Sequence, residues 1–138
     1  MSKNLKTTIS LGSKINELDV LSKQLTKFFS QTTHVNLINP INLLLEELFS
    51  NTIKYGQCVD AAVNIELELT SDTLKIIYMD NGIAFNPLTF IIEPISNESI
   101  EDRKIGGLGI QLIKTMTNQL DYQRIDNQNI LIMIKNIS

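Results

Sequence analysis

The residues of this chain that could do chemistry gather in three short segments, of which the first reads LLLEELFSNTIKYG, residues 43–56. On a helical wheel that advances about 100° per residue, Glu47, Asn51 and Lys54 share one face, and Glu46 lies well away from it. Such a face could be the wall of a binding site. It could equally be the solvated face that any amphipathic helix carries.

The second segment is YMDNGIAFNP, residues 78–87, in which Asp80 ends an apolar run and Gly82 follows two residues later. A carboxylate at the end of a strand could accept a hydrogen bond from an exocyclic amine, and a glycine lets a ligand approach the backbone closely. The same residues would also form an ordinary Asp-Asn-Gly turn.

The third segment is KIGGLGIQLIK, residues 104–114, in which a glycine cluster leads directly into an amphipathic pattern. Backbone N–H groups at the N-terminus of a helix can cradle a phosphate. The segment lacks the GK[ST] ending of a P-loop and the preceding strand of a dinucleotide fingerprint, so taken alone it supports a nucleotide site only weakly.

The composition of the chain limits the functions that these three segments can have. The chain has 138 residues, 43% hydrophobic and 20% charged, which is typical of one globular domain spanning residues 1–138. A single cysteine, Cys58, and a single histidine, His34, exclude an internal disulfide, make a Cys/His zinc site implausible and favour a reducing, cytoplasmic location. No signal peptide or membrane-spanning run is recognisable, and the net charge of −3 argues against direct nucleic-acid binding.

Hydrophobic periodicity predicts the elements that must position the three segments. Strands are expected at residues 5–11, 62–69, 73–80, 120–126 and 129–136, the last two joined by a turn at DNQN. Helices are expected at residues 14–29 with Ser13 as N-cap, from Asn39-Pro40 to about Tyr55 before Gly56, and at residues 107–120. Residues 86–105 show no sustained period, which predicts a lid over approximately 88–105. This order indicates an α+β fold, a two-layer sandwich with helices on one face of a mixed, mostly antiparallel sheet.

Together, the order and spacing of the three segments resemble the sequence boxes of the histidine-kinase-like ATPase (GHKL) superfamily over nearly the whole chain. The plan that fits best is that of the bacterial anti-sigma-factor serine kinases, the RsbW-like family. EELFSNTIKYG resembles that family's E-x-x-x-N-x-x-x-H/Y-G helix, DNGIAFNPL its D-x-G-x-x-F-[DN]-P box, and GGLGIQLIKTMTNQLDYQR its G-G-x-G segment with the following strand. The resemblance implies the Bergerat ATP-binding fold.

The resemblance also implies roles for individual residues. Asn51 would coordinate a Mg²⁺ ion that bridges the phosphates of ATP, and Asp80, assisted by Gly82, would bind the adenine amine. Glu47 would take the proton of the attacking hydroxyl or would activate water. The other residues assigned to ATP are Gly106, Gly107, Leu108 and Gly109 in the phosphate cradle, Arg103 and Lys104 in the lid, and Lys54, which could equally be a solvated surface lysine.

The function implied by the resemblance is that of an ATP-dependent serine/threonine-protein kinase acting as an anti-sigma factor. It would sequester a sigma factor and phosphorylate a STAS-type anti-sigma antagonist, and it would form a homodimer, as members of this family usually do. One alternative is a nucleotide-gated binding module that sequesters its partner without phosphorylating it. Another is an ATP-binding accessory of a sensor-kinase pathway.

Overall fold

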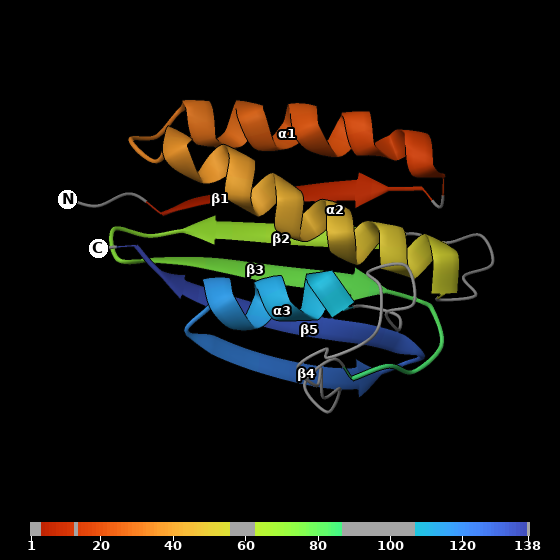
Figure 1. Ribbon diagram of the computed structural model, residues 1–138. Helices are drawn as coiled ribbons and strands as arrows, with labels where there is room; N and C mark the ends of the chain where they lie inside the picture. Colours follow the sequence, from red (N-terminus) through yellow and green to blue (C-terminus); the bar gives the residue numbers. More distant parts are fainter. Residues whose placement is uncertain (1–3, 13, 56–62, 87–106, 138) are drawn as a thin grey trace, which may run out of the picture.

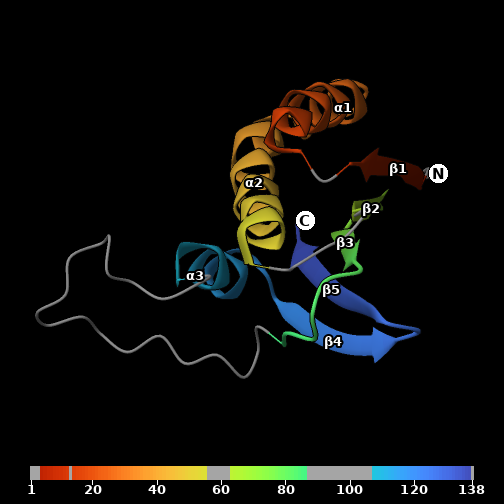
Figure 2. The same cartoon turned by 90° about the vertical axis from the view of Figure 1, so that its right-hand side faces the viewer.

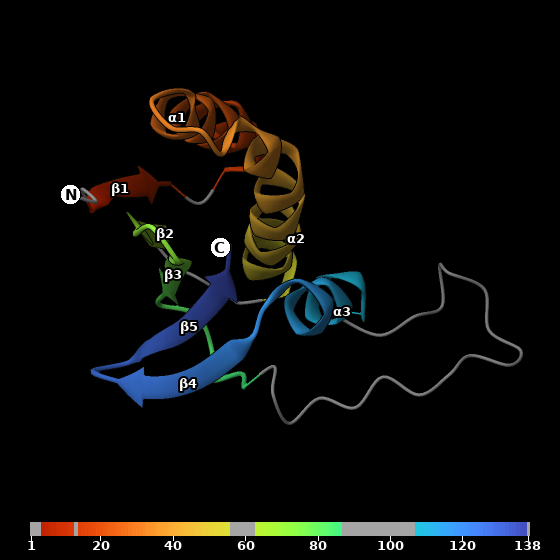
Figure 3. The same ribbon diagram turned by 90° about the vertical axis from the view of Figure 1, so that its left-hand side faces the viewer.

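The computed structural model describes residues 4–12, 14–55, 63–86 and 107–137 (Figure 1). It contains a five-stranded sheet with the spatial order β1-β2-β3-β5-β4, in which every pairing is antiparallel. The strands are β1 (Leu5–Leu11), β2 (Val63–Leu69), β3 (Thr73–Asp80), β4 (Gln119–Ile125) and β5 (Gln128–Asn136). The helices α1 (Leu18–Ser30), α2 (Ile38–Tyr55) and α3 (Gly107–Met116) cover one face of this sheet (Figures 2 and 3). The predicted α+β, two-layer fold is confirmed.

Period-two alternation decides which face of each strand is buried. In β2, the buried residues are every second one, Val63, Ile65, Leu67 and Leu69. The register continues this inner face across the sheet, because Ile9 of β1 lies opposite Ile65, and Leu67 lies opposite Ile76 of β3.

The hairpin between β4 and β5 is tighter than the sequence suggested. Its turn consists of Asp126 and Asn127 alone, whose φ angles of 50° and 62° are conformations that short polar residues tolerate. Gln128, which was expected only in the turn, therefore begins β5, one residue before the predicted start of this strand at Asn129.

The start of α1 differs from the prediction. The α-helix begins at Leu18 after a 3-10 turn, Ile15–Glu17, and its N-cap is Glu17 rather than Ser13, so the predicted cap is wrong. The side chain of Glu17 makes no capping hydrogen bond to the helix; its Oε1 accepts one from the backbone N–H of Gly12 at 3.2 Å.

The start of α2 also lies slightly upstream of the prediction. A 3-10 turn, Val35–Leu37, leads directly into Ile38, so Asn39 and Pro40 lie inside the first helical turn rather than at its cap. Proline is tolerated there because the N–H groups of a first turn have no intrahelical acceptor. The helix ends at Tyr55 as predicted, and Gly56 lies outside the described residues.

The helix α3 ends earlier than its hydrophobic spacing predicts, because the chain after it pairs with β5. Helical spacing included Leu120, but the helix stops at Met116 and Leu120 lies in β4. The chain leaves the helix because it joins β5: the Asn118 N–H donates to the Ile134 carbonyl at 2.7 Å, and Asn118 Oδ1 accepts from the Asn136 N–H at 2.7 Å.

The core lies between the helical layer and the inner face of the sheet. Its largest fully buried side chains come from both layers and are Phe29, Phe49, Ile9, Leu11, Leu21, Leu25, Ile41, Leu44, Leu45, Ile65, Leu67 and Leu74. The apolar side chains Ile41, Leu44, Leu45 and Phe49 of α2 thus belong to the core, and the polar face of the helix remains outside it. In the described part of the chain, no helix is long and apolar enough to cross a membrane.

Candidate functional site

One end of the sheet brings together elements that are distant in the sequence (Figure 1). The C-terminal ends of α2, β3 and β4 lie there together with the N-terminal ends of α3 and β5. The three segments singled out in the sequence belong to α2, to the end of β3 and to the start of α3. The fold therefore brings their described parts to the same end of the sheet.

Asp80 is the best-defined polar group at this end. Its Oδ1 accepts hydrogen bonds from the backbone N–H of Gly82 and from Asn129 Nδ2, both at 2.9 Å. Its Oδ2 accepts one from the Thr52 hydroxyl at 3.1 Å. The bond to Gly82 closes the Asp-Asn-Gly turn, so the ordinary turn and a carboxylate suited to a ligand are compatible interpretations of the same residues.

Thr52 connects α2 to the end of β3. It is only 6% exposed, and its Oγ1 lies 3.0 Å from the Leu48 carbonyl, 2.7 Å from the hydroxyl of Tyr78 and 3.1 Å from Asp80 Oδ2. A threonine hydroxyl carries one proton, so Thr52 donates to one of these three oxygens at a time, and its lone pairs can accept from the Tyr78 hydroxyl when that group is the donor. This contact holds the C-terminal half of α2 over the Asp80 carboxylate.

Asn129 and Arg124 hold the loop that follows Asp80. They lie opposite each other across β4 and β5. Asn129 Nδ2 donates to the Ile83 carbonyl at 2.8 Å, and Arg124 Nη1 donates to the Gly82 carbonyl at 2.7 Å. Asn129 Oδ1 in turn accepts the backbone N–H of Phe85 at 3.2 Å.

The polar face of α2 carries the other predicted residues. Glu47 and Asn51 are half-buried, and Lys54 in the last turn is exposed. Among the described residues, neither Glu47 nor Asn51 makes a side-chain hydrogen bond, whereas the adjacent Glu46 accepts one from Asn42 Nδ2 at 2.9 Å. Glu47 and Asn51 share a helix face because they are four residues apart, and Asn51 precedes the Thr52 that contacts Asp80.

The glycine segment is described only in part. The backbone of Gly107, Leu108 and Gly109 forms the first turn of α3, so their N–H groups belong to a helix N-terminus. Gly106, Arg103, Lys104 and the predicted lid over approximately 88–105 lie outside the described residues.

The described residues contain no cluster of three or more His, Cys, Asp or Glu side chains that could hold a metal ion. A cation at this end of the molecule would therefore find few ligands among the described side chains. Asn51 could supply one amide oxygen, with ligand oxygens and water completing the coordination, as Mg²⁺ sites commonly do.

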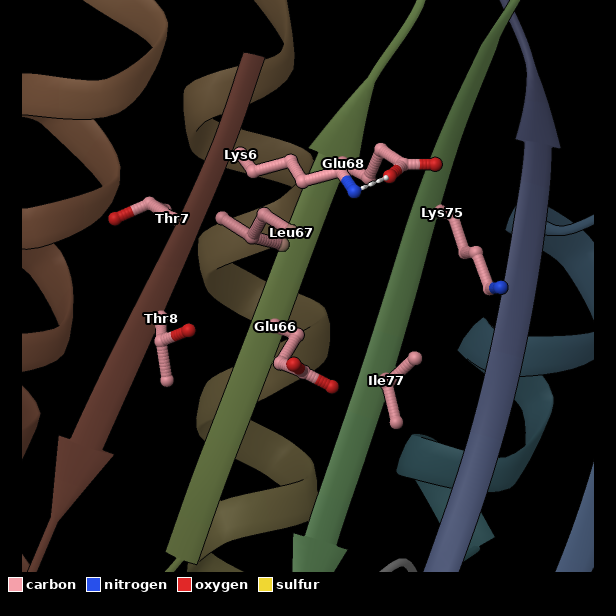
Figure 4. Close-up of a pocket in the computed structure, with 8 residues that line it drawn as sticks. All are labelled: Lys6, Thr7, Thr8, Glu66, Leu67, Glu68, Lys75 and Ile77. Carbon is pink, nitrogen blue, oxygen red and sulfur yellow. Dashed lines mark ion pairs between the residues drawn. The ribbon is translucent and has the colours of Figure 1, made fainter. Parts of the chain in front are cut away.

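A separate hollow of about 520 Å³ lies on the opposite, helix-free face of the sheet (Figure 4). It is lined by outward side chains such as Glu66 and Ile77, whereas Tyr78, two residues before Asp80, is buried on the inner face. Lys6 Nζ lies 2.9 Å from Glu68 Oε2 in this hollow; the hydrogen bond and charge of Glu68 raise the pKa of Lys6, and the hydrogen bond from Lys6 lowers the pKa of Glu68. The two charges thus satisfy each other, and this hollow is not the site that the three segments form.

Sequence reasoning missed four residues around Asp80. Thr52 and Tyr78 lay within the predicted helix and strand and were given no role in the site. Asn129 was expected in the turn and at the first position of the strand 129–136, and Arg124 was given no role. A signal existed for Asn129 alone, because it is a polar residue next to the apolar run at residues 130–134 of β5.

Residues 17–135 match the family model of the histidine kinase-like ATPase domain. The chain is also similar to the serine/threonine-protein kinase BtrW of Bordetella bronchiseptica, with 28% identity over 91 residues. That match covers 64% of this chain and spans 63% of the length of BtrW.

Proposed function

Because this chain belongs to the histidine kinase-like ATPase domain family, we propose that it binds ATP with Mg²⁺ where α2, β3 and α3 meet. We further propose that it is a cytoplasmic, homodimeric serine/threonine-protein kinase of the anti-sigma type. It would sequester a sigma factor and phosphorylate a STAS-type antagonist in a partner-switching system. The similarity to BtrW, which is named a serine/threonine-protein kinase, supports the kinase part of this proposal.

The observation that carries the proposal is the pattern of hydrogen bonds to the Asp80 carboxylate. Each carboxylate oxygen has about two acceptor sites. Both sites of Oδ1 are occupied, by Gly82 and Asn129, whereas Oδ2 has one partner among the described residues, Thr52. An acceptor with room for one more donor, at the half-buried end of a strand, suits the exocyclic amine of adenine.

The remaining parts of ATP would lie along α2 and α3. Backbone N–H groups in the first turn of α3, at Gly107, Leu108 and Gly109, suit phosphate oxygens. Asn51 would bind Mg²⁺, which when bound neutralises charge on the phosphates. Gly106, Arg103 and Lys104 keep their predicted roles as part of the same proposal. Lys54 is exposed and would reach a phosphate only at the edge of the site.

Glu47 would serve as the base in phosphoryl transfer. The serine oxygen of the antagonist forms a bond to the γ-phosphorus while the bond from phosphorus to the β–γ bridging oxygen breaks and ADP leaves. The hydroxyl proton passes to the Glu47 carboxylate, one helical turn from Asn51. Glu47 suits this role because no described side chain occupies its carboxylate, unlike that of Glu46.

The decisive experiment is intact-mass analysis of candidate STAS-domain antagonists after incubation with Mg-ATP and this protein. Wild type should add one phosphate, and Glu47→Ala should add none while still binding ATP in calorimetry. Glu46→Ala is the matched control, because it removes the neighbouring carboxylate from a different face of the same helix and should leave transfer intact. Loss of ATP binding along with transfer in Glu47→Ala would make Glu47 structural.

The second candidate is a nucleotide-gated binding module without kinase activity. It is favoured if wild type binds ATP and forms a stable complex with an antagonist yet adds no phosphate. The absence of described hydrogen bonds to Glu47 argues for the kinase, since a domain that only sequesters its partner has no need of an unpaired carboxylate beside the metal ligand.

A further inference from the structure

The loop after β3 is held by residues that do not belong to the three sequence segments. The contacts come from the end of the β4–β5 hairpin, where Asn129 and Arg124 face each other across the two strands. Between them they bind the carbonyls of Gly82 and Ile83 and the side chain of Asp80. The hairpin is therefore joined to the nucleotide-facing loop by side chains as well as by the sheet.

Asn129 uses all of its hydrogen-bonding capacity within the protein. Its two Nδ2 protons go to Asp80 Oδ1 and to the Ile83 carbonyl. Its Oδ1 accepts from the Phe85 N–H and from the Tyr122 hydroxyl. A carboxamide has two donors and two acceptor sites, and the side chain is only 9% exposed, so nothing is left to contact a ligand. Asn129 acts through another residue if it acts on a ligand at all.

That other residue is Asp80. With Gly82 and Asn129 both donating to Oδ1, rotation of the carboxylate would break two hydrogen bonds, and Oδ2 is held as the oxygen available to a ligand. We propose that Asn129 is a positioning residue for base recognition, which fixes Asp80 so that the site prefers a purine with an exocyclic amine over one with a carbonyl at the same position. The proposal rests on the proposed function, in which Asp80 binds adenine.

The chemistry of the two bases makes this testable. The 6-amino group of adenine donates to a fixed carboxylate oxygen, whereas the 6-oxo group of hypoxanthine presents lone pairs to it. A carboxylate that can rotate or move away loses this discrimination, because its oxygen no longer has to face the 6-oxo group and the repulsion between their lone pairs is relieved. The readout is therefore the ratio of affinities for ADP and IDP, which general destabilisation alone does not change.

The experiment is calorimetric titration of the full chain with ADP and with IDP, each with Mg²⁺. Wild type should prefer ADP by about tenfold or more, and Asn129→Ser should reduce that preference to about threefold or less. Asn129→Asp keeps the size of the side chain but places an acceptor against Asp80 Oδ1, and it should reduce the preference at least as much. Met133→Ala is the matched control: Met133 is a fully buried residue of the same strand, so its loss lowers stability without touching the loop.

The outcomes separate the proposal from its premise. Loss of the preference in Asn129→Ser with its retention in Met133→Ala supports the positioning role, and Asn129→Ser alone suffices if Asn129→Asp does not fold. An unchanged ratio in a folded Asn129→Ser, or an equal loss in Met133→Ala, overturns the positioning role while leaving ATP binding in place. A wild type that does not bind ADP, or that binds IDP equally well, overturns the adenine assignment of the proposed function and this inference with it.

Discussion

At the scale of single residues, Asp80 and Asn51 are fixed to very different degrees. Asp80 receives hydrogen bonds from Thr52 of α2, from Asn129 of β5 and from Gly82 in the turn after β3, so its orientation is set before any ligand arrives. Asn51 is half-buried and makes no side-chain hydrogen bond with a described residue. In the proposed nucleotide site, the base contact at Asp80 would therefore be preformed, whereas the metal contact at Asn51 would be completed by the ligand.

This difference leads to a prediction for Asn51→Ala. Removing the amide oxygen should weaken Mg-ATP binding by about tenfold or more and should abolish most of the affinity gained on adding Mg²⁺. Calorimetry with and without Mg²⁺ measures both quantities. Asn42→Ala, on the same helix, is the control, since Asn42 contacts Glu46 instead. A Mg²⁺-dependent affinity equal to that of wild type would remove Asn51 from the metal site.

At the scale of elements, α2 serves two roles on two faces. One face packs Ile41, Leu44, Leu45 and Phe49 into the core, and the other carries Glu47 and Asn51. Packing of the first face sets the position of the second, because a helix is rigid over this length. Stability and site geometry are thus linked through one helix.

The core face of α2 gives a stability prediction. Phe49 is 0% exposed, so Phe49→Ala should lower the free energy of unfolding by about 3–5 kcal/mol, a large part of the total for a domain of this size. Leu43→Ala on the same helix, where the side chain is 44% exposed, should cost far less. Urea titration of both variants beside wild type tests this, and equal losses would mean that α2 is not packed as described.

The β1–β2 pair gives a prediction about pH. Because the pKa of Glu68 is lowered from its ordinary value of 4.5, its contribution is present above pH 4.5 and is lost as the pH falls through the lowered value. Because the pKa of Lys6 is raised from 10.5, its contribution is present below pH 10.5 and is lost as the pH rises through the raised value. Both groups face solvent, so Lys6→Gln should barely change Tm at pH 7, and the small difference should vanish in acid and in high salt. A large, salt-insensitive drop in Tm would contradict this.

At the scale of the whole molecule, one end of the sheet combines elements from both halves of the chain. A ligand bound there would contact α2, β3 and α3 together (Figure 1), so its binding should stabilise the fold as a unit. This is the physical basis for testing the proposed function through global stability.

We expect Mg-ATP at about 100 times its Kd to stabilise the protein by about 2.7 kcal/mol, which corresponds to a rise in Tm of about 10 °C for a domain of this length. Thermal unfolding with and without nucleotide measures the shift. Asp80→Asn should lose most of it, and Leu43→Ala should keep it. A wild type whose Tm does not respond to Mg-ATP would contradict nucleotide binding at this end.

The sequence by itself determined the elements and the buried faces, because hydrophobic periodicity is a local property of the chain. It placed β1, β2 and β3 at their observed bounds or within a residue of them, it separated the two faces of α2, and it put Asp80 at the end of a strand. Only the tertiary structure decided what surrounds Asp80. Thr52 approaches Asp80 from a helix. Asn129, which is 49 residues after Asp80 in the chain, approaches it from another strand. No local pattern carries such contacts, because they depend on how strands pair across the sheet and on where a helix crosses it.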